Sequence, residues 1–264
     1  MFKIGVFDSG IGGLTVVKAL NQVIHNSKIF YIADTKHAPY GEKTPQQILK
    51  YSLNISQYLI DKYNIDALVL ACNTATAFAI EHLRKEYPKL IIIGTEPGVK
   101  PAIEQTKTGK IGVLATPATL RGDKYQNLVT SLSNKKKVTL FEQPCSGLVE
   151  QIEKGEVDSL ETRELLTPWL LPMRDNDVDT IVLGCTHYPL VKDLILNILS
   201  RDIVLIDTGL AISKHLLKCI IKKNHQNIGD NELNVESTGE INQKSVQFIL
   251  GKEVNISPIS IFNS

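Results

Sequence analysis

Two nine-residue segments of this chain are near copies of each other. They are Asp66-Ala-Leu-Val-Leu-Ala-Cys72-Asn-Thr74 and Asp179-Thr-Ile-Val-Leu-Gly-Cys185-Thr-His187. A short apolar run bounded by polar residues is typical of a fully buried strand in a parallel sheet. Open α/β sheets place their ligands at the carboxyl ends of such strands. Each copy is therefore expected to present one thiol, Cys72 or Cys185, at a functional sheet edge.

A second internal repeat supports the first. The segment Ile4-Gly-Val-Phe-Asp-Ser-Gly10 matches Ile111-Gly-Val-Leu-Ala-Thr-Pro117, and both read as a strand that runs into a turn. The chain is therefore predicted to form two related α/β lobes, each a mainly parallel sheet flanked by helices, with the site in the cleft between them. We expect residues 1–96 and 209–264 in the first lobe, which carries Cys72, and residues 97–208 in the second, which carries Cys185.

Strand and helix signals alternate along the chain, as βα units require. Thr44-Pro45 is expected to cap a long helix, because threonine is favoured at the N-cap and proline at the first turn. The helix after the second cysteine is predicted over residues 189–199, and a closing strand over 254–256. The expected strands are 3–7, 29–33, 66–71, 90–94, 110–115, 138–142, 179–184, 204–206 and 233–236.

Composition places the protein among ordinary globular proteins. The chain has 264 residues and a formal net charge of +1, which gives no electrostatic argument for nucleic acid or an anionic membrane. The lysine run 135–137 is expected to be solvated. No secretory signal or membrane-spanning run is recognisable, and the four cysteines are widely separated. A reducing cytoplasmic location with free thiols is therefore expected.

The glycine-rich segment Asp8-Ser9-Gly10-Ile11-Gly12-Gly13 allows three interpretations. It could cradle a dinucleotide phosphate, with Asp34 near the position of a ribose-binding acid. However, Thr15 stands at the third glycine position of GxGxxG, and Asp8 would repel a pyrophosphate. The segment could also be a plain structural turn. The interpretation we favour is a site for a small zwitterion, with N–H groups and Ser9 for a carboxylate and Asp8 for an ammonium or a reacting group.

The two repeated cysteines are candidates for acid/base chemistry. Each precedes a predicted helix, whose N-terminal N–H groups and dipole favour a thiolate. A zinc site at Cys185 and His187 would lack the further paired ligands that zinc requires. A Cys-His nucleophile for amide hydrolysis is a better rival, but it leaves Cys72 without a role. Cys145 and Cys219 are expected to be structural.

The loop Pro39-Tyr40-Gly41 follows the strand that ends near Asp34. This position places it at the mouth of the predicted cleft. It could be a simple turn. Alternatively, the Tyr40 hydroxyl and nearby N–H groups could hold a distal carboxylate.

The sequence resembles the glutamate racemases of the cofactor-independent aspartate/glutamate racemase superfamily. The resemblance extends over essentially the whole chain. The matching segments, in family order, are Phe7-Asp-Ser-Gly10, Pro39-Tyr-Gly41, Ala71-Cys-Asn-Thr-Ala75, Gly94-Thr-Glu-Pro97, Lys100-Pro-Ala102, Gly112-Val-Leu-Ala-Thr116 and Gly184-Cys-Thr-His-Tyr-Pro-Leu190.

The resemblance implies interconversion of L- and D-glutamate for peptidoglycan synthesis by a homodimer, with no cofactor and no metal. It implies that Cys72 and Cys185 are the two acid/base residues, assisted by Asp8 and His187. Asp34 and Glu153 are expected to support the site, although Glu150 lies close enough in sequence to compete with Glu153. The implied substrate contacts are Asp8, Ser9, Tyr40, Gly41, Asn73, Thr74, Thr186 and His187.

Two opposed thiols suit racemisation, because the Cα proton leaves from one face and another arrives at the opposite face. One sulfur is expected as thiolate and the other as thiol, so a bell-shaped pH dependence is predicted. The preference for glutamate over aspartate depends on the resemblance alone. An aspartate or related amino-acid racemase therefore remains the alternative.

Overall fold

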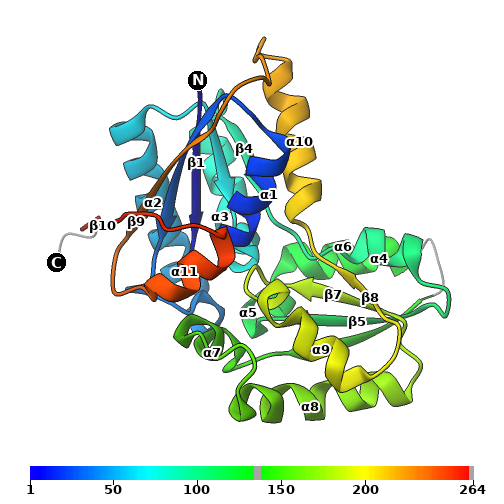
Figure 1. Ribbon diagram of the computed structural model, residues 1–264. Helices are drawn as coiled ribbons and strands as arrows, with labels where there is room; N and C mark the ends of the chain where they lie inside the picture. The colour runs from blue at the N-terminus through cyan, green and yellow to red at the C-terminus, as the bar shows by residue number, and fades with distance from the viewer. Residues whose placement is uncertain (134–137, 262–264) are drawn as a thin grey trace.

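The structure is a computed structural model that describes residues 1–133 and 138–261. Two α/β lobes lie one above the other, and their parallel sheets are separate (Figure 1). The lysine run 135–137 lies outside the described residues. Within the described residues, no helix combines the length and apolar character needed to cross a bilayer.

The sheet of the first lobe has six strands in the order β10-β9-β2-β1-β3-β4, and every pairing is parallel. Its central strands are almost entirely buried, which explains their continuous apolar sequences. The strands are β1 (Phe2–Asp8), β2 (Ser27–Ala33), β3 (Ala67–Leu70), β4 (Ile91–Gly94), β9 (Glu232–Ser237) and β10 (Ile256–Pro258).

The sheet of the second lobe has four parallel strands in the order β6-β5-β7-β8. They are β5 (Lys110–Ala115), β6 (Thr139–Pro144), β7 (Thr180–Gly184) and β8 (Val204–Ile206). All strands of this sheet fall within the predicted second lobe, and all strands of the other within the two segments predicted for the first. The residues at which one lobe passes into the other stay a prediction.

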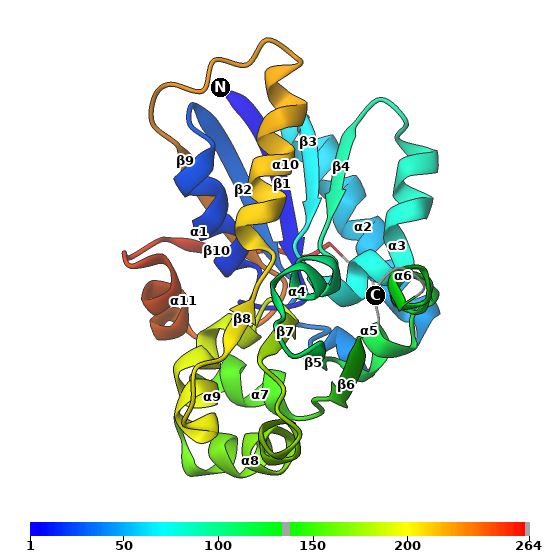
Figure 2. The ribbon, with the colours of Figure 1, turned by 90° about the vertical axis from the view of Figure 1, so that its right-hand side faces the viewer.

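Helices cover both faces of the first sheet (Figure 2). One face packs against α1 (Leu14–Val23), α10 (Gly209–Ile221) and α11 (Gln243–Leu250), and the other against α2 (Pro45–Tyr63) and α3 (Asn73–Glu86). Thr44 and Gln47 form a capping box at the start of α2, with Pro45 in the first turn, as the sequence predicts. Such a cap stabilises a helix by about 1 kcal/mol.

The second sheet is also covered on both faces. The helices α7 (Leu148–Lys154), α8 (Leu160–Asp175) and α9 (Lys192–Leu199) pack on one face. The helices α4 (Val99–Gln105) and α6 (Asp123–Ser133) pack on the other, next to the short α5 (Pro117–Arg121). Each lobe therefore has its own apolar core. The helices cover the faces of the sheets and leave the carboxyl ends of the strands, where the two thiols lie, for polar side chains.

The two lobes repeat the same strand register. In the first lobe Ile4 pairs with Ala67, and in the second lobe Ile111 pairs with Thr180. Continuing along both pairs of strands makes Cys72 equivalent to Cys185, and Asp8 equivalent to Ala115. The internal repeat seen in the sequence is thus a repeat of pairing geometry.

Three local expectations differ from the structure. The closing strand is Ile256–Pro258, two residues later than predicted, because Ile256 is the residue that pairs with Val235 of β9. The predicted helix over 189–199 divides into the 3₁₀ helix η2 (Tyr188–Val191) and α9. The helix α4, which follows the turn at residues 95–98, was not predicted because Pro101 interrupts its sequence pattern.

The aspartates that begin the repeated segments bind main-chain N–H groups at the ends of the strands opposite the thiols. Asp66 accepts a hydrogen bond from the N–H of Lys3 at 2.8 Å. Asp179 accepts from Thr106 Oγ1 at 2.6 Å and from the N–H groups of Lys107 and Thr108 at 2.7 and 2.9 Å. Burial raises the pKa of Asp179, but these donors lower it to about 2.

Candidate active site

Cys72 stands at the junction of β3 and α3. It is the N-cap of α3, and its sulfur accepts the N–H of Ala75 at 3.4 Å, so the predicted helix N-terminus is present. A thiolate at Cys72, which this helix terminus would favour, is opposed by the rest of its surroundings. Burial raises the pKa of the Cys72 thiol well above its usual value, and the charge of Asp8 adds to this effect. One weak N–H contact does not offset the loss of water around a thiolate.

Cys185 occupies the equivalent place after β7, but its surroundings differ. It does not directly precede a helix, because Thr186 and His187 intervene before η2. Its sulfur lies 3.7 Å from Nδ1 of His187. The Cys185 thiol therefore lies beside an imidazole, whereas Cys72 is the N-cap of an α-helix.

Asp8 ends β1 and is completely buried. Its Oδ2 accepts the N–H of Gly13 at 2.7 Å and the hydroxyl of Thr186 at 3.3 Å, whereas Oδ1 has no hydrogen-bond partner among the described residues. Burial raises the pKa of the Asp8 carboxyl, against the lowering effect of the positive charge of His187 and of the Gly13 N–H. The free oxygen is an acceptor held ready for a ligand.

His187 is anchored by Glu153 of α7. Its Nε2 lies 2.6 Å from Glu153 Oε1, and the same oxygen accepts the N–H of Ile11 from the first lobe at 2.7 Å. Burial lowers the pKa of His187, but the bonds and negative charges of Cys185 and Glu153 outweigh it and raise the pKa well above its usual value. These contacts favour a protonated imidazole, which would donate from Nε2 to Glu153 and face Cys185 with Nδ1.

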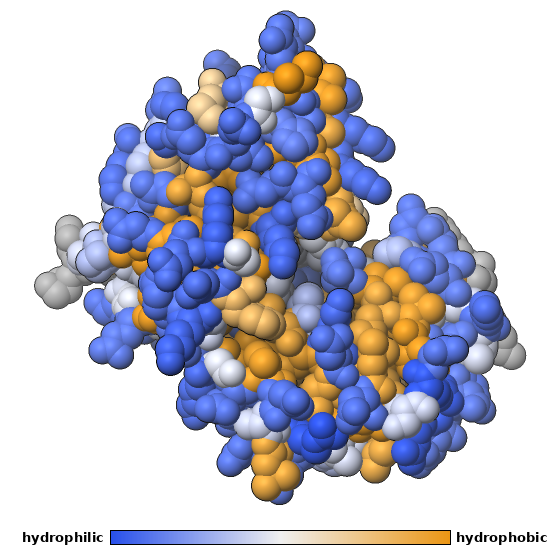
Figure 3. Space-filling model, viewed as in Figure 1, coloured by the Kyte–Doolittle hydropathy of each residue, from blue (hydrophilic) through white to orange (hydrophobic). Residues whose placement is uncertain are grey.

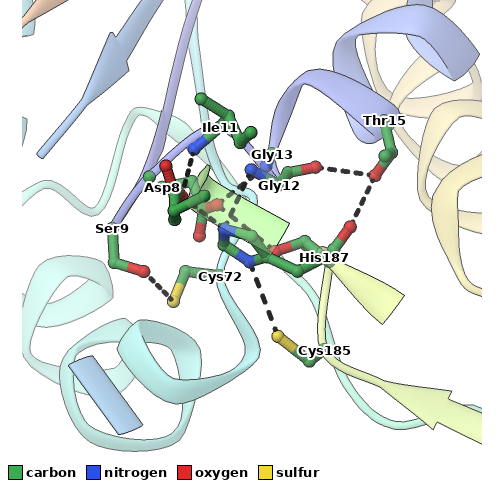
Figure 4. Close-up of polar contacts among 12 residues, drawn as sticks. Asp8, Ser9, Ile11, Gly12, Gly13, Thr15, Cys72, Cys185 and His187 are labelled. Atoms are coloured by element: carbon green, nitrogen blue, oxygen red, sulfur yellow. Dashed lines mark hydrogen bonds and ion pairs between the residues drawn. The ribbon is translucent and has the colours of Figure 1, made fainter. Parts of the chain in front are cut away.

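The two thiols face one shared space from different lobes. Figure 4 shows the sulfurs of Cys72 and Cys185 directed toward the same region, with Asp8 and His187 beside it. Charge on Cys185 raises the pKa of Cys72, which requires the two groups to be near each other. The repeat therefore places a pair of sulfurs around a common centre.

The backbone of the glycine-rich turn is not available for a phosphate. The N–H of Gly13 is bonded to Asp8, that of Ile11 to Glu153, and that of Gly12 points at Nε2 of His187 at 3.2 Å. The carboxylates of Asp8 and Glu153 thus occupy two of the N–H donors that a dinucleotide would need. This geometry argues against the dinucleotide interpretation.

The remaining side chains predicted to contact the substrate differ in whether their polar atoms already have a partner. Ser9 lies 4.0 Å from the Cys72 sulfur. Asn73 is 5% exposed, and its Nδ2 lacks a hydrogen-bond partner within the described part of the chain. The Tyr40 hydroxyl donates to Asp34 Oδ2 at 2.6 Å, and its contact with a distal carboxylate stays a prediction. Asp34, also bonded to His37 and Thr238, therefore fixes the Tyr40 loop.

Two threonines of the second lobe belong to the site although they were not singled out. The Thr74 hydroxyl lies 2.9 Å from that of Thr116 and 3.2 Å from that of Thr119, and all three side chains are buried where the lobes meet. The internal repeat carries a signal for one of them, because Thr116 is the counterpart of Ser9. Gly41 packs against Thr116, since a Cβ there would lie 2.7 Å from the Thr116 Cβ.

A cavity of about 540 Å³ opens beside Cys185. It reaches Asn73 and Thr186 at its inner end, and α1, α10 and α11 form its walls. The space-filling view shows this face of the molecule hollowed where the lobes meet, next to an apolar area on the second lobe (Figure 3). Cys72 does not line this cavity and is more enclosed than its counterpart.

The other two cysteines lie apart from this chemistry. Cys145 is buried and directs its sulfur to the carbonyl of Gln143 at 3.3 Å, whereas Cys219 is half-buried in α10. The described residues contain no group of three or more His, Cys, Asp or Glu side chains placed to hold a metal ion.

Comparison with known proteins agrees with this geometry. The profile of the family Asp/Glu/Hydantoin racemase matches residues 4–216. The chain belongs to this family. It is 61% identical to glutamate racemase of Sulfurovum sp. over 94% of both chains, and 57% identical to glutamate racemase of Aliarcobacter butzleri over 94% of this chain and 95% of the relative. Glutamate racemase of Francisella tularensis, solved in complex with D-glutamate, superposes with a TM-score of 0.84 at 29% identity, covering 98% of each chain.

Membership in this racemase family fits the paired thiols of the site. The two-lobed α/β fold predicted from the sequence is confirmed by the matching structures.

Proposed function

We propose that this chain interconverts L- and D-glutamate by proton transfer between two thiols and the Cα atom, without a cofactor. The observation that carries the proposal is a pair of buried, unpartnered atoms of opposite kind beside the thiols. Asp8 Oδ1 is an acceptor and Asn73 Nδ2 is a donor, and neither has a partner among the described residues. An unpaired buried polar group costs about 1–3 kcal/mol, which a zwitterionic ligand would recover with its ammonium and carboxylate.

The positive charge of the substrate ammonium favours ionisation of the Cys72 thiol. In the unliganded site, burial and Asp8 hold Cys72 as a neutral thiol. An ammonium bound at Asp8 Oδ1 places a positive charge next to both groups, which favours the thiolate. Asp8, whose own pKa is raised, accepts the thiol proton as the thiolate forms. The first thiol thereby becomes a base when the substrate arrives.

The second thiol acts with His187. While Cys72 removes the Cα proton from D-glutamate, Cys185 delivers its proton to the opposite face, and the His187 imidazolium returns one to Cys185. The reverse direction uses the same groups in the opposite order. Glu153 holds the imidazole ring at 2.6 Å and stabilises its positive charge. General acid–base help of this kind contributes ~10²–10⁴-fold to a rate.

The carbanion gains its stabilisation from fixed donors. Asn73 Nδ2 and main-chain N–H groups near the start of α3 can meet the α-carboxylate as charge develops on it. These donors lie in a water-poor site, where they stabilise charge more than they would in solution. This is the role that a cofactor plays in other amino-acid racemases.

The deciding experiment follows optical activity by circular dichroism with reductant present and no cofactor added. D- and L-glutamate should each lose their signal until it reaches zero, whereas D- and L-aspartate should change far more slowly. Faster loss of the aspartate signals would instead support an aspartate racemase. An unchanged glutamate signal would overturn the proposal. A stable mass increase on Cys185 with an amide substrate would favour the Cys-His hydrolase alternative.

The cellular role follows from the reaction. D-glutamate produced in the cytoplasm would supply peptidoglycan synthesis, and expression of the chain should restore growth of a bacterium that requires D-glutamate. We further propose a homodimer, in line with the resemblance. Sedimentation equilibrium should give twice the chain mass of 29.3 kDa; a monomer at all concentrations would contradict this.

A further inference from the structure

A tyrosine beneath the glycine-rich turn has no role in the reaction described so far. Tyr31 lies in β2, where it pairs with Val6 of β1, and its side chain is completely buried. Its hydroxyl reaches the turn that follows β1 and donates a hydrogen bond to the carbonyl of Gly10 at 2.5 Å. A phenylalanine would fill almost the same volume, so the buried hydroxyl needs its own explanation.

The turn anchored by Tyr31 directs its N–H groups at the partners of both thiols. Gly13 N–H donates to Asp8, which lies beside Cys72. Ile11 N–H donates to Glu153, which orients His187 beside Cys185. The Gly10 carbonyl therefore belongs to a short segment whose N–H groups at Ile11 and Gly13 bond the partners of the two thiols. Figure 4 shows Ile11 and Gly13 beside Asp8 and His187.

We propose that Tyr31 is a positioning residue, whose hydroxyl fixes the turn at Gly10 and thereby holds Asp8 and the Glu153–His187 pair in their working orientation. The inference rests on the proposed racemisation. Packing around the hydroxyl supports it: a Cβ on Gly13 would lie 2.6 Å from the Asp8 Cβ and 2.9 Å from the Tyr31 oxygen. Gly13 therefore lies close to both Asp8 and the Tyr31 hydroxyl, so a shift of the turn alters the surroundings of both.

Tyr31 does not itself exchange protons with the substrate. Burial, reinforced by the negative charges of Asp8 and Glu153, raises its pKa well above the usual value. The hydroxyl keeps its proton throughout the working pH range and remains a donor to Gly10. Its effect on the reaction passes through the residues that the turn holds.

The test is Tyr31→Phe, with Tyr125→Phe as the matched control. Tyr125 is also buried, and its hydroxyl donates to the Glu142 carboxylate at 2.6 Å in the second lobe, apart from the turn. We expect Tyr31→Phe to lower kcat for glutamate about tenfold or more, with little change in KM. Tyr125→Phe should keep the wild-type kcat, although both variants lose a buried hydrogen bond and melt at a lower temperature.

The pH profile separates positioning from simple stability. If the turn loosens, Asp8 loses the N–H of Gly13, its pKa rises further, and the acid limb of the kcat profile moves to higher pH. The charged groups facing Asp8 are His187, Glu153 and Cys72, and Tyr31→Phe changes none of them. A wild-type kcat and pH profile in Tyr31→Phe, with only a lower melting temperature, would overturn the inference.

A measurement without substrate keeps the inference independent of the proposed reaction. The alkylation rate of Cys72 by iodoacetamide, followed by peptide mass mapping against pH, reports the thiolate directly. An Asp8 carboxylate that is no longer held beside Cys72 raises the pKa of that thiol less. The alkylation profile of Tyr31→Phe should therefore shift to lower pH, and that of Tyr125→Phe should not. If the wild type fails to racemise glutamate but the shift occurs, the proposed function fails and the positioning role stands. If neither variant shifts the profile, the positioning role fails.

Discussion

Glu153 of the second lobe accepts a hydrogen bond at 2.7 Å from the main-chain N–H of Ile11 in the first lobe. The same carboxylate oxygen lies 2.6 Å from His187 Nε2. One carboxylate oxygen therefore contacts both the first lobe and the imidazole of His187. Glu153 and His187 both lie in the second lobe, so this oxygen couples the Glu153–His187 pair to the glycine-rich turn of the first lobe.

Replacing either repeated thiol should stop racemisation. Cys72→Ser or Cys185→Ser should lower kcat by at least ~100-fold, because a positioned proton-transfer group is lost. Each variant should still remove the Cα proton from the face served by its remaining thiol. HX elimination from one enantiomer of a glutamate analogue with a leaving group on Cβ measures this half-reaction. Cys219→Ser, half-buried in α10, is the control and should behave as wild type. Undiminished racemisation in either single variant would contradict the two-thiol scheme.

Removing the charge of Asp8 should make Cys72 more acidic in the free protein. Asp8→Asn retains the shape and the acceptor for Gly13 but removes a charge that raises the Cys72 pKa. Alkylation of Cys72 should therefore begin at lower pH, while racemisation falls because the ammonium loses its partner. Asp207→Asn, on the outer wall of the cavity, is the control. An unchanged or higher onset of alkylation would show that Asp8 does not govern this thiol.

Glu153, and not Glu150, should control His187. Glu153→Gln removes both a hydrogen bond to a carboxylate and its negative charge, so the pKa of His187 should fall. Glu150→Gln changes the same helix without removing that bond. Nuclear magnetic resonance titration of the His187 imidazole compares the two variants. A larger fall in the Glu150 variant would reverse the assignment.

The Glu153–His187 pair makes the free energy of unfolding depend on pH. The folded-state pKa of His187 is raised, so its contribution is fully present below the unfolded value of ~6.5 and is lost as pH rises through the folded value. Chemical unfolding of wild type and His187→Asn should therefore differ most below about pH 6 and progressively less in alkaline solution. A difference that grows with pH would contradict a protonated His187.

The contribution of Asp179 to the free energy of unfolding should change with pH in the opposite direction. Its folded pKa is lowered to about 2, so its contribution is present above the unfolded value of ~3.9 and is lost as pH falls through 2. Asp179→Asn should cost about 1–2 kcal/mol of unfolding free energy at pH 7, after allowance for solvent screening, and little near pH 2. Asp177→Asn, an exposed neighbour, should change stability by less than about 0.5 kcal/mol. An equal loss at both pH values would exclude the charge as the cause.

The sequence predicted the strands and the two thiols because both belong to a repeat. Buried parallel strands carry continuous apolar runs, and a residue conserved between two internal copies stands out against its neighbours. The surroundings of the thiols were harder to foresee. The pKa of Cys72 depends on how completely the folded chain removes water, and the bond of Tyr40 to Asp34 depends on rotamers that no local pattern encodes. Thr119 and Tyr31 reach the site through packing between segments distant in sequence.

Asp8 has no carboxylate counterpart in the second lobe, where Ala115 takes its place, and His187 has no imidazole counterpart in the first. Mirror-image substrates nevertheless have equal free energies in solution. The ratio kcat/KM must therefore be identical for both, whatever groups surround the two sulfurs. The chemical inequality of the lobes can only appear as a tighter-bound, slower enantiomer balanced against a looser-bound, faster one.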